Sequence, residues 1–172
     1  MLLPFTEGLT RVGNFDAESA FLADRHYSRQ SIGSPQFMPP GRTIVLRDSQ
    51  GLVVFGWLWQ EKRDDGQQGY NCSIFRNESD RRSSEIILEA EKAAFKAWGP
   101  RRLFTYVDGS QLRGQAGKYR KPKVIGKCFL AAGWKMRVRK NGKPHLSPNG
   151  LYLFVKPSYL APLCIPAGRS VQ

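Results

Sequence analysis

One stretch of the chain, residues 83–98, repeats its apolar side chains about every 3.6 residues, whereas the stretches on either side have the shorter period of strands. This spacing predicts an amphipathic helix. Ser83 or Ser84 can cap its start, glutamates in its first half suit the helix dipole, and Gly99 ends it. One long helix between groups of strands limits the chain to a mixed fold of helices and strands.

Apolar runs between turn residues predict the remaining elements. A short helix follows Asn14 or Asp16 to about residue 25, with Ala17, Ala20 and Phe21 on its buried side. We expect strands at 43–47, 52–60, 70–76, 103–107, 134–139 and 151–155, a short helix at 125–132, a lead-in segment at 1–13 and a loop at 31–42. The expected fold class is α+β (mixed α/β): a single domain over residues 1–156, with a mostly antiparallel sheet flanked by helices, and a proline-containing tail at 157–172.

Charge divides the 172-residue chain into two unlike parts. Residues 1–100 carry 12 basic and 13 acidic side chains, a net charge of −1, whereas residues 101–172 carry 15 basic side chains and one acid, Asp108, a net charge of +14. A surplus of this size on one part of a chain indicates a polyanionic partner such as nucleic acid.

Composition excludes several other classes of protein. A hydrophobic fraction of 41% argues against a disordered basic protein. No apolar run is long enough to cross a bilayer, and the first residues lack the pattern of a secretory signal, so we expect no membrane partner. Three scattered cysteines indicate a reducing compartment, and we expect the protein in the cytoplasm.

Two clusters contain residues suited to acid–base chemistry. His26 and Tyr27 lie just past the end of the first predicted helix, and histidine titrates in the range that acid–base catalysis needs. Asp108 follows the predicted strand 103–107, and ligands of α/β proteins collect at the carboxyl ends of parallel strands. Simpler explanations are a histidine that interacts with a helix dipole and an aspartate that caps a turn.

A basic loop after Asp108 is the best candidate for nucleic-acid binding. Cations spaced by glycines suit a loop that follows phosphates, and Tyr119 can stack on a base. The predicted nucleic-acid-binding residues are Arg113, Lys118, Arg120, Lys121, Lys123 and Lys127.

The predicted order of elements resembles the GNAT-type acyltransferase fold. In that fold a glycine-containing loop before the long helix holds the pyrophosphate of coenzyme A. This chain has no glycine in residues 76–84, which puts coenzyme A in doubt. The residues there that can still hold phosphate are Arg76, Arg81, Arg82, Ser83 and Ser84.

Together these motifs resemble the Mom family of phage DNA-modification proteins. The resemblance covers about residues 15–156 and rests on the His26–Tyr27 pair, the stretch YVDGSQLRGQAGKYRKP and the turn GKCFLAAGWK. It implies conversion of adenine in double-stranded phage DNA to N6-carbamoylmethyladenine, which protects the DNA from host restriction, in the cytoplasm of an infected cell. It also implies active-site roles for His26, Tyr27, Asp108 and Tyr119, with an iron or other metal as a minor alternative.

Two acyl donors fit this resemblance. The carbamoylmethyl group is an isomer of a glycyl group joined to N6, so glycyl transfer from an aminoacyl-tRNA followed by rearrangement gives the product. Acetyl-CoA is the usual donor of the GNAT fold. Two other functions remain open: a GNAT acetyltransferase that acts on a protein or small molecule, and a nucleic-acid-binding module without catalysis.

Overall fold

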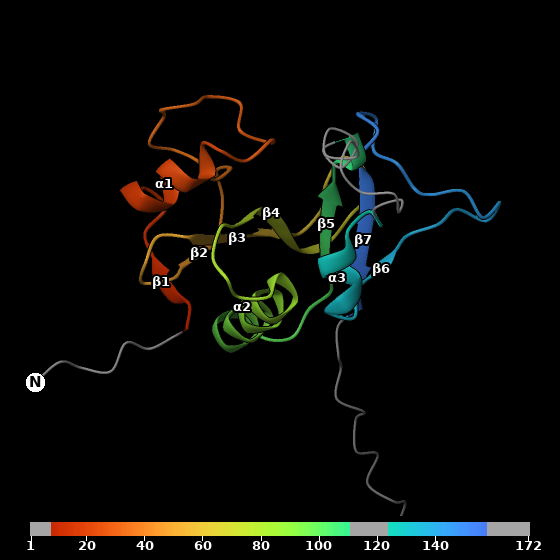
Figure 1. Ribbon diagram of the computed structural model, residues 1–172. Coiled ribbons are helices and arrows are strands. Elements are labelled where there is room, and N and C mark those ends of the chain that lie inside the picture. The colour runs from red at the N-terminus through yellow and green to blue at the C-terminus, as the bar shows by residue number, and fades with distance from the viewer. Residues whose placement is uncertain (1–7, 111–123, 158–172) are drawn as a thin grey trace, which may run out of the picture.

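The computed structural model describes residues 8–110 and 124–157, and in them it contains a mixed α/β fold (Figure 1). The mixed α/β class expected from the sequence is therefore confirmed. The helices are α1 (Ala17–Ala23), α2 (Ser83–Trp98) and α3 (Lys127–Ala131). The strands are β1 (Thr10–Val12), β2 (Thr43–Arg47), β3 (Val53–Gln60), β4 (Gly69–Asn77), β5 (Leu103–Val107), β6 (Lys135–Met136) and β7 (Tyr152–Lys156).

All seven strands belong to one sheet, in the order β1-β2-β3-β4-β5-β7-β6. Every neighbouring pair is antiparallel except β4 and β5. These two parallel strands share only two residue pairs, Tyr70 with Leu103 and Asn71 with Phe104. Beyond them the hydroxyl of Thr105 donates to the carbonyl of Cys72 at 2.8 Å, and the regular ladder ends.

The helices α1 and α2 cover opposite faces of the sheet (Figure 1). Alternate residues of a strand point to opposite faces, so each strand contributes to two cores. In β2, Ile44 and Leu46 pack in the core under α2, whereas Val45 packs in the core under α1. The core under α2 also receives Phe129 from α3 and Trp134 from the turn that follows it.

An extra residue in β4 interrupts this alternation. Gly56 pairs with Ile74 but the next residue of β3, Trp57, pairs with Cys72, so Ser73 has no partner in β3. A bulge of this kind moves the following side chains to the other face. Cys72 consequently belongs to the core under α2, while Ile74 belongs to the core under α1.

A buried ion pair joins α2 to β7. The ammonium of Lys156 donates to Glu91 at 2.6 Å and to the carbonyl of Ala132 at 2.9 Å. The other oxygen of Glu91 accepts from the indole of Trp134 at 2.7 Å. Glu91 and Lys156 are 5% and 6% exposed, so this network replaces nearly all the water that the two charges would bind in the unfolded chain.

Most predicted elements lie within a few residues of the observed ones, but several details differ from the predictions. Phe21 is 69% exposed with the guanidinium of Arg25 over its ring, because the short helix α1 buries Ser19, Ala20, Leu22 and Ala23 instead. Ala17 is likewise exposed. Arg82, not a serine, occupies the N-cap position of α2, and its side chain makes no capping hydrogen bond; Ser83 lies inside the helix and accepts from Asn77.

Two further differences concern the edges of the sheet. Residues 10–12 form the short edge strand β1, although their exposed side chains lack an apolar pattern. The strand expected at 134–139 stops at Met136, since Val138 pairs with Pro144 instead of with β7. Among the residues that the structure describes, no helix has both the length and the apolar character to cross a membrane.

The buried ion pair gives a test of stability. We expect Lys156→Met to lower the free energy of unfolding by about 3–5 kcal/mol, because it leaves the Glu91 carboxylate buried without its counter-ion. The double variant Glu91→Gln/Lys156→Met keeps an acceptor for Trp134 and removes the charge, so it should recover more than half of that loss. Urea denaturation measures both. Lys92→Met, at an exposed site of the same helix, is the control, and a double variant no more stable than Lys156→Met would contradict the prediction.

A second test concerns Gly126, which precedes α3. Its φ is +64°, and a Cβ atom there would overlap the ring of Phe154. Gly142 has a similar φ of +76° with nothing within 4 Å of such an atom. Gly142→Ala should therefore cost about 1–2 kcal/mol for backbone strain alone, and Gly126→Ala should cost roughly 1–3 kcal/mol more for overpacking. Equal losses in thermal melts would show that Phe154 does not restrict this position.

Candidate functional site

The end of β5 holds Asp108 in a defined position. One oxygen of its carboxylate accepts hydrogen bonds from the backbone amide of Ser110 at 2.9 Å and from the hydroxyl of Ser110 at 2.7 Å. Between them, Gly109 lies so close to Tyr152 that a Cβ atom would be 2.8 Å from its ring. The backbone therefore turns sharply directly after β5, and Asp108 stays at the strand end.

Tyr27, from the segment that follows α1, contacts the backbone at this strand end. Its hydroxyl donates to the carbonyl of Tyr106 at 3.4 Å and accepts from the amide of Asp108 at 3.3 Å. The ring remains 42% exposed. Burial of the hydroxyl raises the pKa of Tyr27, and the nearby Asp108 charge raises that pKa further, so the phenol keeps its proton at neutral pH.

A clamp after α1 fixes the segment that contains Tyr27. Arg29 pairs with Asp24, the C-cap of α1, at 2.7 Å and donates to the carbonyls of Ser34 and Gln36. Asp24 also accepts from the amide of Gly33 at 3.0 Å. The side chain of Arg29 is only 7% exposed, so the loop is tied to the helix end and the turn at 25–28 has little freedom.

His26 packs against Tyr27, with the two ring centroids 4.3 Å apart. Its Nδ1 accepts from the backbone amide of Ser28 at 3.2 Å and lies 2.7 Å from the hydroxyl of the same residue. In the neutral ring the proton is therefore on Nε2, which makes that nitrogen a donor. Burial, and secondly the charge of Arg76, lower the pKa of His26 to about 4, so the ring is neutral at physiological pH.

Arg76 is held beside His26 by a small ionic network. Glu78 binds Arg25 at 2.8 Å and Arg76 at 3.0 Å, and Arg76 also donates to the carbonyl of Arg25 at 2.9 Å. The hydrogen bond from Arg25 is the main reason that the pKa of Glu78 falls to about 2. This predicted phosphate-binding arginine is thus next to the histidine and not at the start of α2.

The other predicted phosphate-binding residues lie at the start of α2. Arg81 folds back onto Glu89 at 2.6 Å, and Ser83 accepts from Asn77 at 3.0 Å. Arg82 is exposed, and the first turn of α2 has no side-chain cap. Ser84, in the same turn, is half-buried. Backbone amides at the start of a helix attract anions when no side chain caps them. The amides of the first turn of α2, together with the side chain of Arg82, can therefore hold one phosphate group.

Several predicted residues fall outside the described part of the chain. They are Tyr119 and the basic-loop residues Arg113, Lys118, Arg120, Lys121 and Lys123. Lys127 is described, and it is exposed at the first position of α3. The structure therefore brings together His26, Tyr27 and Asp108. Arg76 lies beside His26, and the next residue, Asn77, donates to Arg81 and Ser83 at the start of α2.

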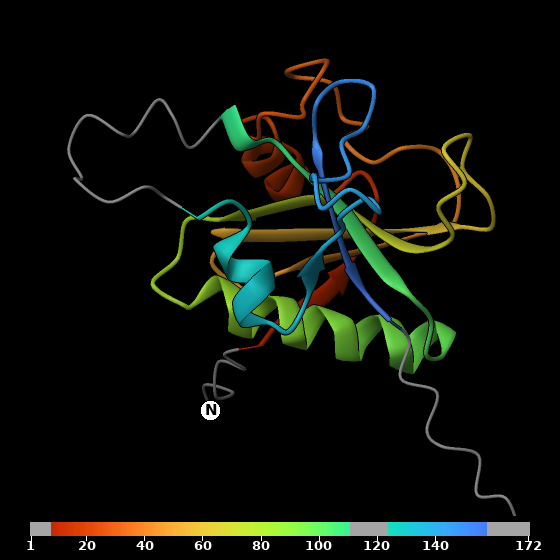
Figure 2. The ribbon, with the colours of Figure 1, turned by 90° about the vertical axis from the view of Figure 1, so that its right-hand side faces the viewer.

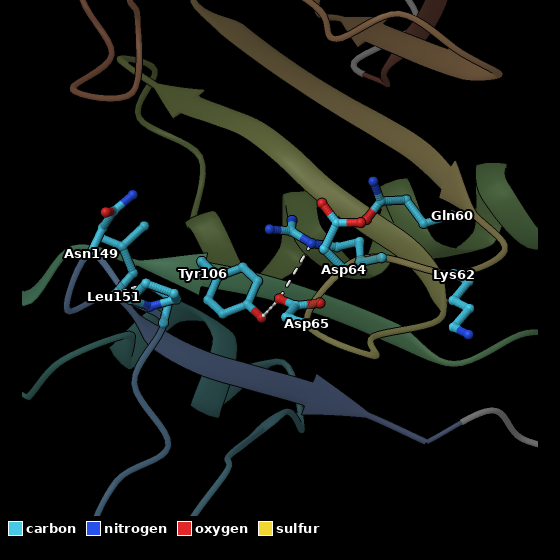
Figure 3. A pocket seen from close by; sticks show the side chains of 10 residues that line it. Gln60, Lys62, Asp64, Asp65, Tyr106, Asn149 and Leu151 are labelled. Atoms are coloured by element: carbon cyan, nitrogen blue, oxygen red, sulfur yellow. Dashed lines mark hydrogen bonds and ion pairs between the residues drawn. The ribbon is translucent and has the colours of Figure 1, made fainter.

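Sequence reasoning did not identify the pocket that contains Tyr106. This pocket encloses about 670 Å³ between the loop after β3 and the loop before β7 (Figure 3). The hydroxyl of Tyr106 donates to Asp65, which also pairs with Arg63 at 3.3 Å. Burial, and then Asp65, raise the pKa of Tyr106 to about 12. The sequence did contain one indication of this site: Tyr106 is two residues before Asp108, so the two side chains are expected on the same side of the strand.

The thiols of Cys72 and Cys128 lie near the same strand end. Cys72 is 6% exposed, and burial raises the pKa of both thiols, so neither is an activated nucleophile. In the described residues, no three His, Cys, Asp or Glu side chains are grouped so that they could hold a metal ion. Comparison of the chain with protein-family models and with curated proteins found no match.

The neutral state of His26 can be measured directly. Because its folded pKa of about 4 lies below the ordinary value of 6.5, the stability that neutral His26 contributes is complete above pH 6.5 and is lost as pH falls through about 4. Arg76→Gln should move the NMR titration midpoint of His26 upward, while burial still keeps it below 6.5. Arg81→Gln is the control, since Arg81 pairs with Glu89. A midpoint near 6.5 in the unmodified protein would contradict the burial of this ring.

Proposed function

We propose that the protein is a DNA-modifying acyltransferase of the Mom type, which acts on the N6 amine of adenine in double-stranded DNA. The sheet supports a GNAT-like fold for this activity. Its one parallel pair, β4 and β5, lies inside an otherwise antiparallel sheet, and the long helix α2 connects the two strands. Fold likeness alone does not define an activity, so the proposal depends on the residues at the end of β5.

The observation that carries the proposal is the contact of Tyr27 with the end of β5. The hydroxyl of Tyr27 is hydrogen-bonded to the backbone of Tyr106 and of Asp108, and the ring of neutral His26 lies against Tyr27 with the ring centroids 4.3 Å apart. A protonated phenol, an imidazole and the residue that carries the Asp108 carboxylate therefore meet at the end of β5. These groups can donate and accept protons at neutral pH, which is what transfer of an acyl group to a weakly nucleophilic amine requires.

The proposed step transfers one acyl group and one proton. The N6 amine attacks the carbonyl carbon of an activated ester or thioester, a C–N bond forms, and the bond to the leaving oxygen or sulfur breaks. Asp108 accepts the proton from N6, and Tyr27 protonates the leaving group. The proton on Asp108 then passes to the Tyr27 phenolate, so that both groups return to their starting states and one proton in total has moved from N6 to the leaving group. His26, through Nε2–H, donates to the carbonyl oxygen as charge develops on it. The adenine must first leave the base stack to reach these groups.

The start of α2 supports an acyl donor carried by a nucleic acid over coenzyme A. Arg76 and Arg81 already pair with Glu78 and Glu89, which leaves Arg82 and the first amides of the helix. This arrangement offers one phosphate position and no glycine loop for a pyrophosphate. A glycyl ester of tRNA needs no such loop, and the glycyl amide that it forms is an isomer of the carbamoylmethyl product, reached by rearrangement without an oxidant or reductant.

The decisive experiment incubates purified protein with duplex DNA and either glycyl-tRNA or acetyl-CoA, followed by mass spectrometry of the digested nucleosides. We expect modified adenine with glycyl-tRNA. Asp108→Ala should lower the rate by roughly 10²–10⁴-fold while duplex binding persists, because a positioned base contributes about that much. Tyr27→Phe, which keeps the ring, should also slow the reaction, whereas Tyr152→Phe removes a neighbouring hydroxyl to which no role is assigned and should not.

Two other outcomes distinguish the alternative functions. Acetylation of a protein or small molecule from acetyl-CoA, with untouched DNA, would identify an ordinary GNAT acetyltransferase. Unmodified DNA with both donors, together with tight duplex binding, would identify a nucleic-acid-binding module without catalysis.

A further inference from the structure

A basic arm of the chain, residues 137–146, lies between β6 and β7 and projects from that edge of the sheet (Figure 1). The amide of Arg139 donates to the carbonyl of Lys143 at 2.8 Å, and the amide of His145 donates to the carbonyl of Arg137 at 2.8 Å. Val138 pairs with Pro144 in the same register. The arm is therefore a two-stranded antiparallel ribbon that turns at Gly142, where φ is +76°.

This register sorts the side chains of the arm by charge. Residues opposite each other in an antiparallel pair share a face, and residues two apart on one strand share it too. Arg137, Arg139, Lys143 and His145 consequently occupy one face of the ribbon. Val138, which is 51% exposed, and Pro144 occupy the other.

The basic face continues onto the sheet. Lys135 is exposed two residues before Arg137 on the same strand. The guanidinium of Arg102 lies over the ring of Phe104. Burial is the main cause that lowers the pKa of Arg102, and the charge of nearby Arg137 is the second cause. Arg102 is held in place by Gln67 and Gln68. Leu103 and Met136 pack in the core under α2, so Arg102, Lys135 and Arg137, each one residue away along the chain, face the other side of the sheet. Arg102 also lies close enough to Tyr106 and Asp65 of the pocket for these groups to affect its pKa. Figure 2 shows α2 along one side of the sheet.

The cations of this face have no acidic partners within the described residues. No ion pair found there involves Lys135, Arg137, Arg139, Lys140 or Lys143. Asp65 of the pocket acts on Arg102, but it already binds Tyr106 and Arg63, and the sequence has no acid after Asp108. Like charges kept together at an exposed site lower stability, so a polyanion that binds them would relieve their repulsion.

We propose that the basic arm, residues 137–146, binds duplex DNA with its basic face against the phosphates that border the major groove. A two-stranded ribbon fits the major groove of B-form DNA, about 12 Å wide, whereas the major groove of A-form RNA is too deep and narrow for side chains. The choice of DNA rests on the proposed function, but the binding surface does not depend on catalysis.

The test compares two triple variants that remove the same charge. Arg137→Gln/Arg139→Gln/Lys143→Gln neutralises the arm, and Arg11→Gln/Lys92→Gln/Lys96→Gln neutralises exposed cations on β1 and α2. We expect the arm variant to bind a 30-base-pair duplex on the order of 10²-fold more weakly at 0.1 M salt, with the slope of log K against log salt reduced by about 2–3, since each lost phosphate contact removes about 0.9. The control variant should retain both values, and both variants should melt as the unmodified protein does.

Three results would overturn the proposal. They are equal losses in the two variants, an unchanged duplex affinity in the arm variant, and a loss of binding to folded RNA with duplex binding intact. Failure of the enzyme assay is a separate outcome. Weak duplex binding by the arm variant, in a protein that modifies no adenine, would remove the proposed activity and leave the arm as a DNA-binding surface.

Discussion

The ion pair of Glu91 with Lys156 connects parts of the chain that no backbone ladder joins. It links the middle of α2 to the end of β7 and, through Trp134 and the carbonyl of Ala132, to the turn after α3. Two charges removed from water need complete hydrogen bonding, so this network forms only when all four groups are in place. It therefore aligns α2, α3 and β7 as one unit, against which β5 and the candidate site are positioned.

The candidate site is assembled from segments far apart in the sequence. Tyr27 follows a short helix near the start of the chain, and Asp108 follows a strand about 80 residues later. Their meeting depends on local devices that have no direct chemical role. The Arg29–Asp24 clamp fixes the turn that holds Tyr27, and the close contact of Gly109 with Tyr152 fixes the turn that holds Asp108.

Sequence reasoning could predict features that depend on local periodicity. The helix at 83–98 and the strands at 43–47 and 103–107 match the observed bounds, since each has a regular apolar pattern. It failed where tertiary contacts decide, as at the exposed ring of Phe21 and at β1, which has no apolar alternation of its own. The site residues were chosen by chemical type, but the pocket at Tyr106 was missed because Asp65 comes to it from a loop 41 residues away.

The extra residue in β4 has a consequence for the chemistry at the other end of that strand. Arg76 is two residues beyond Ile74, so it shares the face that the bulge at Ser73 assigns to the α1 side. Without that residue the second half of β4 would turn over, and Arg76 would leave the side on which His26 lies. The smaller of the two causes that lower the pKa of this imidazole thus depends on a single residue of strand register, and a one-residue deletion remote from the ring would raise that pKa while burial still keeps the ring neutral at physiological pH.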